Sequence, residues 1–332
     1  MKIQTSDRVQ RVKPSPTLAV TALAQQLRAQ GRDVIGLAAG EPDFDTPDHI
    51  KAAAIKAIQD GLTKYTAVDG TVGLKQAIIN KFSRDNGLDY NLDEILVSVG
   101  GKQVIYNLMQ ALLNAGDEVI IPAPYWVTYP ELVKYCGGKV VEIETHDTDG
   151  FKITPEQLKE AITDKTRMLV LTTPSNPTGA VYSKEELTAL GKVLEGTKVI
   201  VASDEMYEKL IYEGTFTSAA AASDDMYQRT VTINGLSKSV AMTGWRFGYM
   251  AAANTELIKA TKKLQSQSTS NINSITQKAA IVGLDGQADD DIEMMRKAFK
   301  ERRDEAVVLF NAVDGLSVLK PDGAFYLFVN IS

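Results

Sequence analysis

Short runs of β-branched and other apolar residues alternate with helical patterns along most of this 332-residue chain, and this alternation limits the folds that it can adopt. The runs span Glu94–Val99, Glu118–Ile121, Lys139–Glu144, Met168–Thr172, Lys198–Ala202, Thr230–Ile233 and Phe247–Ala251. Strands separated by helices return in the same direction, and they form a mostly parallel sheet that helices cover on both faces. We therefore predict an α/β fold with a mostly parallel, seven-stranded sheet between helices.

Capping residues mark several of the helices. The segments Thr154–Gln157 and Ser183–Glu186 have the residue pattern of capping boxes, in which two side chains satisfy each other's free backbone amides. Thr46-Pro47 predicts the N-cap and first position of a third helix that stops at Gly61. That helix is expected to turn four residues inward, namely Ile50, Ala54, Ala57 and Ile58.

The pattern changes at Asp289, where a long charged helix begins, and a strand-like segment follows at Ala324–Val329. One helix and one strand are too little to enclose a core, so either the N-terminal segment completes this unit or its C-terminal part is missing. We predict three segments: residues 1–45 from a small domain, residues 46–288 as the large ligand-binding domain, and residues 289–332 as the incomplete start of the C-terminal small domain.

Composition excludes several kinds of function. A net charge of −6 argues against a general nucleic-acid or anionic-membrane surface, which favours a small-molecule ligand. The single cysteine, Cys136, cannot form an intrachain disulfide, and two distant histidines cannot build a zinc site alone. No apolar window is long enough for a membrane span, and the first ten residues lack a Sec-type apolar segment. We expect a cytoplasmic protein without a metal.

Lys238 is the first candidate for chemistry. It follows the run Thr230–Ile233 through a turn of small residues, so it lies at the carboxyl end of a strand, where open α/β sheets bind their ligands. A lysine in this position can be desolvated, and its neutral amine is then a nucleophile toward an aldehyde. The alternative is an ordinary surface lysine on a loop.

Other polar groups follow the ends of the neighbouring strands. Asp204 and Tyr207 come after Lys198–Ala202, and Asn176 comes after Met168–Thr172. Gly100-Gly101 opens a helix, a typical phosphate-binding arrangement, and Arg246 could return a guanidinium to the same anion. Each feature alone is compatible with an ordinary turn or solvated loop. Because all of them fall at the same ends of successive strands, they favour one site for a phosphorylated ligand.

The motifs "AAGEPDFDTPDHI", "TKYTAVDGTVGLKQAI", "SVGGKQVIYNLMQALLNAGDEV", "PAPYWVTYPE", "PSNPTGAVYS", "SDEMYE" and "GLSKSVAMTGWRFGY" occur in this order. Together they resemble the type-I-fold pyridoxal-phosphate aminotransferases, most closely the class Ib (prokaryotic-type) aspartate aminotransferases. The resemblance extends from about Val9 to the last residue and is highly specific.

The resemblance implies a role for each motif residue around pyridoxal 5′-phosphate. Lys238 would bond covalently to the cofactor and later move the substrate proton, and Asp204 would pair with the ring nitrogen. Tyr207 and Asn176 would bond the cofactor's 3′ oxygen. The residues implied to complete the cofactor site are Trp126 on the ring face, Gly101, Lys102 and Arg246 around the phosphate, Ser237 beside it, and Tyr65 from the neighbouring subunit of a homodimer with shared sites.

The substrate site that the resemblance implies consists of Gly40, Lys102, Trp126 and Asn176. The backbone of Gly40 would approach the α-carboxylate, and Lys102 would recognise an acidic side chain. A first-turn helix lysine pointing at water is the alternative for Lys102. An ordinary core tryptophan and a loop aromatic are the alternatives for Trp126 and Tyr65.

The sequence departs from the family in two places. Many relatives carry serine or threonine three positions before the lysine, where this chain has Gly235, and Ser237 could compensate. Family members also continue well past Ser332, through the rest of the small domain and an arginine that holds the substrate α-carboxylate. From this we expect the chain as given to bind the cofactor but to transaminate poorly.

The leading prediction is an aspartate transaminase that works by ping-pong half-reactions on L-aspartate and 2-oxoglutarate, giving oxaloacetate and L-glutamate. Alternatives on the same scaffold are a prephenate or aromatic amino acid aminotransferase, a pyridoxal-phosphate lyase acting at Cβ or Cγ, and a catalytically weak fragment that binds the cofactor. A nicotinamide dehydrogenase is disfavoured, because no G-x-G-x-x-G follows any predicted strand.

Overall fold

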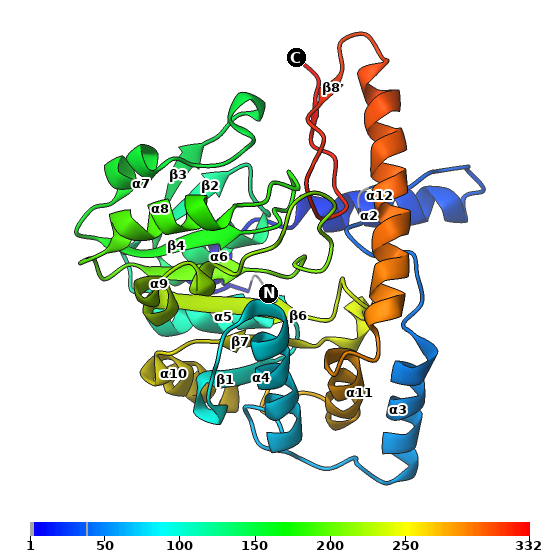
Figure 1. Cartoon of the computed structure of the whole chain (residues 1–332), viewed down its shortest axis with the longest axis vertical. Helices are drawn as coiled ribbons and strands as arrows, with labels where there is room; N and C mark the ends of the chain where they lie inside the picture. The colour runs from blue at the N-terminus through cyan, green and yellow to red at the C-terminus, as the bar shows by residue number, and fades with distance from the viewer. Residues whose placement is uncertain (1–2, 38) are drawn as a thin grey trace.

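Seven strands form one sheet in the order β1-β7-β6-β5-β4-β2-β3 in the computed structural model, which describes residues 3–37 and 39–332 (Figure 1). Neighbouring strands run parallel except at β7, which is antiparallel to both β1 and β6. The strands are β1 (Ile95–Ser98), β2 (Glu118–Ala123), β3 (Lys139–Glu144), β4 (Thr166–Thr172), β5 (Ile200–Asp204), β6 (Thr230–Gly235) and β7 (Gly248–Ala251). The prediction of a mostly parallel, seven-stranded sheet is confirmed.

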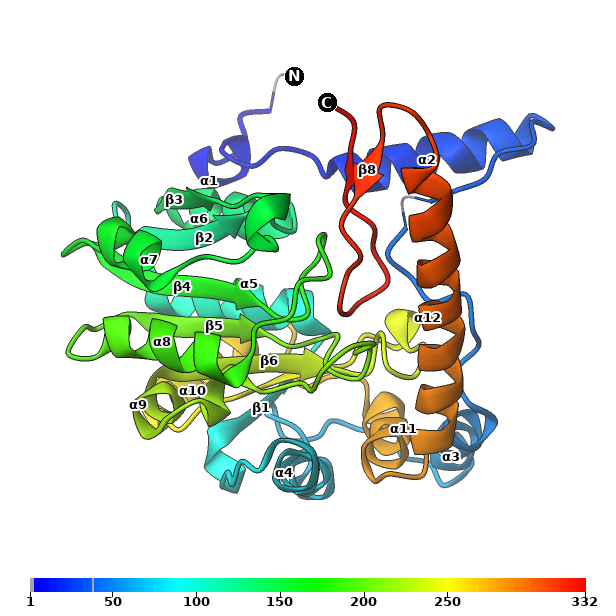
Figure 2. The ribbon, with the colours of Figure 1, turned by 45° about the horizontal axis from the view of Figure 1, so that its top comes forward.

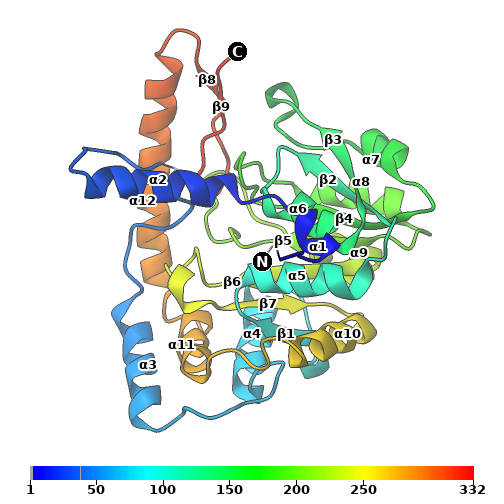
Figure 3. The same cartoon turned by 180° about the vertical axis from the view of Figure 1, so that it is seen from behind.

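Helices cover both faces of this sheet. One face packs against α5 (Gly101–Leu112), α6 (Thr128–Cys136) and α10 (Thr255–Ser266), which are seen from behind in Figure 3. The opposite face packs against α4 (Val72–Asn86), α7 (Pro155–Ala161), α8 (Lys184–Leu194), α9 (Asp224–Arg229) and α11 (Ser274–Leu284), several of which face the viewer in Figure 2. Outside these layers lie α1 (Asp7–Gln10), α2 (Pro16–Ala29), α3 (Asp48–Gln59), which packs on α11, and α12 (Asp289–Asn311).

The two predicted capping boxes are present. Thr154 Oγ1 accepts from Gln157 N at 3.3 Å, and Gln157 Oε1 accepts from Thr154 N at 2.9 Å at the start of α7. Ser183 and Glu186 exchange the same pair of hydrogen bonds at the start of α8. Each box satisfies two backbone donors that the first helical turn leaves free, so these helix starts follow from local sequence.

Two expectations for α3 are wrong. The N-cap is Pro47 rather than Thr46, because the Thr46 hydroxyl donates to Ala241 O at 2.8 Å and accepts from Trp245 Nε1 at 3.0 Å. Tertiary contacts therefore use the oxygen that would otherwise cap the helix. Ile58 is 55% exposed, whereas the three other residues that we expected to turn inward are buried.

The strand-like segment Ala324–Val329 forms much less strand than predicted. Only β8 (Ser317–Val318) and β9 (Val329–Asn330) pair, as a two-stranded antiparallel sheet beyond the end of α12. Ala324 has a φ of 57°, outside the extended region, and its backbone amide donates to Leu210 O at 2.9 Å. The segment is thus bent toward the large sheet rather than extended.

Contacts between the N-terminal segment and α12 support the proposed smaller unit of residues 1–45 and 289–332. Asp43 pairs with Arg302 at 2.7 Å, and the rings of Phe44 and Phe299 meet edge to face with centroids 5.5 Å apart. Positions 1–2 and 38 of this unit lie outside the described residues. Within residues 3–37 and 39–332, no helix combines the length and apolar character needed to cross a membrane.

Candidate active site

A cavity of about 530 Å³ lies at the carboxyl ends of β4, β5 and β6, where the sequence predicts a ligand site. The antiparallel β7 brings the segment before it to the same edge of the sheet. All of the predicted site residues except Tyr65 line this cavity: Gly40, Gly101, Lys102, Trp126, Asn176, Asp204, Tyr207, Ser237, Lys238 and Arg246. Seven separate segments of the chain therefore converge on one site.

Lys238 is largely buried in this cavity, just beyond the end of β6. Its Nζ donates to Gly40 O and lies 5.9 Å from the centroid of the Tyr207 ring. Burial lowers the pKa of Lys238 to about 8, and the charge of Arg246 acts in the same direction, while Glu41 and Asp204 oppose it. An amine with this pKa is partly unprotonated near neutral pH, as a nucleophile toward a carbonyl group requires.

Asp204 ends β5 and is buried. Its Oδ2 accepts a hydrogen bond from the Tyr129 hydroxyl at 2.7 Å, and its Oδ1 accepts from Met206 N at 3.3 Å. Burial raises the pKa of Asp204, while these two hydrogen bonds and the charge of Lys238 oppose that rise. The carboxylate is therefore held by fixed donors at the floor of the cavity.

Tyr129 is a site residue that the sequence reading missed. It is buried on the first turn of α6, and its hydroxyl also lies 3.0 Å from Thr172 Oγ1 at the end of β4. Its ring meets that of Trp126 edge to face at 5.4 Å. The motif "PAPYWVTYPE" contains both aromatic residues at a spacing of three, which brings side chains together at a helical turn, and this spacing was the available signal.

Glycines bring the remaining backbone close to Arg246. Gly100 has a φ of 82°, and a Cβ there would lie 2.6 Å from Arg246 Nη2. A Cβ at Gly248 would overlap Gly101 N, which is the first amide of α5. The guanidinium and the free amides at the start of this helix thus converge, which suits a phosphate group.

Gly235 is explained by the same close packing. A Cβ at this position would lie 2.7 Å from Phe247 O and 3.2 Å from Gly248 Cα, both of which are backbone atoms. A serine could not enter without moving β7. Ser237, which we expected to compensate, is buried and lines the cavity.

Tyr326 is the second site residue that the sequence reading missed. Its hydroxyl lies 2.5 Å from the Tyr207 hydroxyl and accepts from Asn176 Nδ2 at 3.4 Å. Burial raises the pKa of Tyr326 to about 12 and that of Tyr207 well above the ordinary tyrosine value. We expected a strand in this part of the chain, so no pattern in it indicated a residue reaching a distant cavity.

Lys102 lies in the cavity wall, in the first turn of α5. Its Nζ is 4.8 Å from the centroid of the Trp126 ring, within the range of a cation–π contact. Burial, followed by the charge of Arg246, lowers the pKa of Lys102. The geometry disagrees with the alternative in which this lysine points only at water, and its role in substrate recognition stays a prediction.

Glu205, next to Asp204, is buried and unusual. Its Oε1 accepts from Ser203 Oγ, Ser218 Oγ and Ala219 N, each at 2.9 Å, whereas its Oε2 has no hydrogen-bond partner among the described residues. Burial, with a smaller contribution from Glu208, raises the pKa of Glu205 from 4.5 to about 7. The folded protein therefore retains a proton on Glu205 at a pH where an unfolded chain has lost it.

The Glu205→Gln variant is expected to change how stability depends on pH. Between pH 4.5 and about 7 the folded protein binds one more proton than the unfolded chain, so the free energy of unfolding of the wild type falls as pH rises. Over this window the fall amounts to about 3 kcal/mol. Glutamine cannot ionise, so the free energy of unfolding of the variant should lack this fall.

Urea unfolding of both proteins at several values from pH 5 to pH 8 measures this difference. Comparing the two pH slopes cancels any constant effect of the new amide, whose Nε2 group replaces one carboxylate oxygen at every pH. Identical slopes in the two proteins would contradict the assignment of this proton to Glu205.

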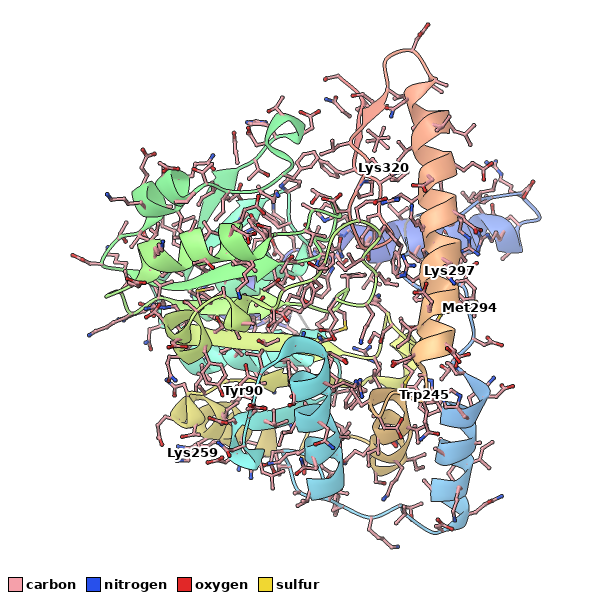
Figure 4. All side chains as sticks on the ribbon, in the orientation of Figure 1. Tyr90, Trp245, Lys259, Met294, Lys297 and Lys320 are labelled. Carbon is pink, nitrogen blue, oxygen red and sulfur yellow. The ribbon has the colours of Figure 1, made fainter. Side chains whose placement is uncertain are left out.

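Tyr65 is 92% exposed and does not line the cavity. Its loop is held against α11, since Leu62 O accepts from Ser274 Oγ at 2.7 Å and Thr66 Oγ1 accepts from Gln277 Nε2 at 2.8 Å. A second cavity, of about 590 Å³, is lined by Trp245, Arg246 and residues at the start of α11. Figure 4 places Trp245 beside that helix. An exposed tyrosine and a cavity that shares Arg246 thus flank the same helix.

The family model described as "Aminotransferase class I and II" matches residues 32–332. An aspartate aminotransferase from Bacillus sp. strain YM-2 is 51% identical over 100% of this chain and 84% of its own length. An aspartate/prephenate aminotransferase from Nitrosomonas europaea is 53% identical over 99% of this chain and 83% of its own length.

The solved structures agree with these sequence relatives. Aspartate aminotransferase from Thermus thermophilus with maleate matches at a TM-score of 0.95 and 46% identity, over 99% of this chain and 85% of that one. Aspartate aminotransferase from Rhizobium meliloti matches at a TM-score of 0.95 and 47% identity, over 99% of this chain and 82% of that one. The fold and the sequence motifs are therefore similar over nearly the whole chain.

Proposed function

Because this chain belongs to the aminotransferase class I and II family and is an enzyme that transfers amino groups, we propose that it moves the amino group of L-aspartate to 2-oxoglutarate. The products are oxaloacetate and L-glutamate, formed in two half-reactions. The observation that carries the proposal is the meeting of Lys238, Asp204 and Arg246 in one cavity. Relatives named aspartate aminotransferase, at about half identity, support the amino donor.

The family depends in general on pyridoxal phosphate, and the residues of this cavity fit that cofactor. A reactive amine, a buried carboxylate and a group of donors that suits a phosphate lie in one cavity. The glycines at positions 100 and 248 have no side chain, so Arg246 and the backbone at the start of α5 can come close together there. Lys238 would hold the aldehyde carbon, Asp204 the ring nitrogen, Trp126 the ring face, and Arg246 with the amide of Gly101 the phosphate. When bound, this cofactor supplies an electrophilic carbon and an electron-withdrawing ring.

Each residue then has a defined task. The Lys238 amine, with its lowered pKa, can accept the proton from the substrate Cα and return it on the other side of the reacting nitrogen. Asp204 would hold a negative charge beside the ring nitrogen and so favour a proton there. Tyr207 and Asn176, which also line the cavity, would donate hydrogen bonds to the cofactor's 3′ oxygen.

The acidic side chain of the substrate would bind to Lys102. Its ammonium group stands over Trp126 at the cavity wall, and the Gly40 backbone, Asn176 and Trp126 complete the proposed substrate site. A cation at the cavity wall attracts a carboxylate more strongly than a neutral side chain.

A second acceptor, prephenate, is favoured by the relatives named aspartate/prephenate aminotransferase, which are as similar as those named for aspartate alone. Prephenate carries a carboxylate on its ring, so Lys102 suits it as well. 2-Oxoglutarate and prephenate differ in size, but both carry a carboxylate that Lys102 would bind.

The proposal is tested by loading the protein with pyridoxal phosphate, adding L-aspartate, and following the visible absorption of the cofactor. We expect aspartate to bleach the visible band, and 2-oxoglutarate to restore it. Oxaloacetate, phenylpyruvate and prephenate, added separately, rank the acceptors. A band that aspartate leaves unchanged, while neutral amino acids bleach it, would reject the proposed donor.

We also propose a homodimer with shared sites and a cytoplasmic location. The exposed Tyr65 and the second cavity at Arg246 lie on either side of the start of α11, and this adjacency lets one patch pair with itself across a two-fold axis. Tyr65 of one protomer would then reach the Arg246 of its partner. Sedimentation of wild type and of a Tyr65→Phe variant, with cofactor affinity measured for both, tests assembly and phosphate binding separately.

Tyr129→Phe should weaken cofactor binding. The substitution removes the donor that holds Asp204 Oδ2, and it makes the charged form of that carboxylate less favourable. A hydrogen bond to a charged group contributes about 1.5 to 3 kcal/mol, so we expect the dissociation constant of pyridoxal phosphate to rise at least tenfold. Fluorescence titration of the cofactor-free protein measures it.

Tyr125→Phe is the matched control, since the Tyr125 hydroxyl donates to Glu142 Oε1 at 2.6 Å and does not reach Asp204. An equal rise in both variants would mean that the phenol of Tyr129 has no special relation to the cofactor.

A further inference from the structure

We propose that Tyr326 is a positioning residue that strengthens the hydrogen bond which Tyr207 donates to the cofactor's 3′ oxygen. The inference rests on the proposed function, since it concerns the same cofactor. It adds to that site a phenol supplied by the C-terminal segment, 119 positions along the chain from Tyr207.

The number of protons on the two phenols sets the direction of this relay once the cofactor is bound. Asn176 Nδ2 can only donate, so at 3.4 Å the Tyr326 oxygen is the acceptor. The Tyr207 and Tyr326 hydroxyls lie 2.5 Å apart, and either one can donate to the other. Tyr207 has only one proton, so when it gives that proton to the cofactor's 3′ oxygen, Tyr326 is the only donor left for the bond between them. With its oxygen occupied in this way, Tyr207 directs its own proton into the cavity that both residues line.

The backbone holds Tyr326 firmly in place. Gly323 N donates to Gly179 O at 3.0 Å, and Ala324 N donates to Leu210 O at 2.9 Å. These acceptors belong to the turns that carry Asn176 and Tyr207, respectively. The segment bearing Tyr326 is therefore fastened to both of the turns whose side chains it contacts.

Close packing at Gly40 leaves the Tyr326 hydroxyl little freedom. A Cβ at position 40 would overlap that hydroxyl, so a glycine is needed to admit the tyrosine. Gly40 O also accepts from Lys238 Nζ. The same backbone segment thus packs against the positioning phenol and the reactive lysine.

A phenol whose oxygen accepts a hydrogen bond becomes a stronger donor, because the two bonds polarise one another. A stronger donor at the 3′ oxygen favours its anionic form, and it lowers the apparent pKa of the covalent link between Lys238 and the cofactor. The charged and titratable groups around this position, namely Lys238, Asp204, Arg246, Glu41 and Tyr129, are the same with or without the Tyr326 hydroxyl.

The test is a pH titration of the visible absorption of the cofactor-loaded protein. Tyr326→Phe is expected to raise the apparent pKa of the link between Lys238 and the cofactor by about half a unit. This shift corresponds to part of the free energy of one neutral hydrogen bond. In a Tyr207→Phe background the same substitution should produce no further shift, since Tyr326 acts only through Tyr207. Tyr106→Phe is the matched control, because Tyr106 forms a phenol pair with Tyr135 at 3.4 Å outside the cavity.

The outcomes are distinct. The relay is supported if Tyr326→Phe raises the apparent pKa in the wild type but not in the Tyr207→Phe background. Tyr106→Phe should leave that pKa unchanged. No shift, a downward shift, or equal shifts in both backgrounds would overturn it while leaving the proposed function intact. Absence of a visible band in the wild type would instead remove the proposed function, and the relay with it.

Discussion

Lys238→Ala is expected to lower the turnover of aspartate by about five orders of magnitude, in the range seen when an enzyme loses its nucleophile. Alanine has no amine to bond the cofactor and no group to carry the substrate proton. The walls of the cavity, the carboxylate of Asp204 and the guanidinium of Arg246 remain in place. The variant should therefore still bind pyridoxal phosphate, although without the visible band of the lysine-bound form.

Steady-state turnover, the absorption spectrum and the melting temperature, measured together, separate these effects. Lys192→Ala, a change at an exposed lysine on α8, is the control and should match the wild type. A Lys238→Ala variant that folds normally and retains a tenth of the wild-type turnover would show that another group performs the proton transfer.

The sequence predicts much of this site because its residues follow the ends of parallel strands. Lys238, Asp204 and Asn176 each come directly after a buried apolar run, and parallel strands place such positions at one edge of a sheet. The positions of these three residues in the chain, together with the strand order, therefore imply that their side chains lie close together. No long-range knowledge beyond the strand order is needed for these three residues.

Tyr129 and Tyr326 could not be found in this way, because their contacts depend on side-chain direction and on a distant segment. Tyr129 looks like a core residue of α6 until its hydroxyl is seen to reach Asp204. Tyr326 lies in the segment Ala324–Val329, which was predicted as strand-like, whereas Ala324 has a positive φ and its amide bonds to Leu210 O. The prediction of Thr46 as the N-cap of α3 was wrong for a related reason, since tertiary partners compete for its hydroxyl.

A buried ion pair also connects the turn that carries Asp204 and Tyr207 to α4. Glu208 pairs with Lys81 of α4, and both side chains are nearly inaccessible to water. Asn86 joins them, accepting from Lys81 Nζ at 2.8 Å and donating to Glu208 Oε2 at 3.1 Å. The position of two proposed cofactor ligands is thereby tied to a helix on the opposite face of the sheet from α5.

Lys81→Met is expected to lower the free energy of unfolding by about 3 to 5 kcal/mol, because it leaves the Glu208 carboxylate buried without its cation. Lys75→Met is a matched control on the same helix. Lys75 is also a buried lysine, paired with Asp69 at 2.7 Å, but Asp69 keeps a second cation, Lys262, at 3.0 Å. Its loss should therefore be clearly smaller.

The double variant Lys81→Met/Glu208→Leu distinguishes an unpaired charge from lost packing. Removing both charges eliminates the buried carboxylate, so most of the stability lost in Lys81→Met should return, leaving chiefly the hydrogen bonds of Asn86 unmade. Urea unfolding of the four proteins at one pH gives these differences. Equal losses in Lys81→Met and Lys75→Met, or a double variant no more stable than Lys81→Met, would mean that the side-chain volume of Lys81, rather than its charge, holds this turn to α4.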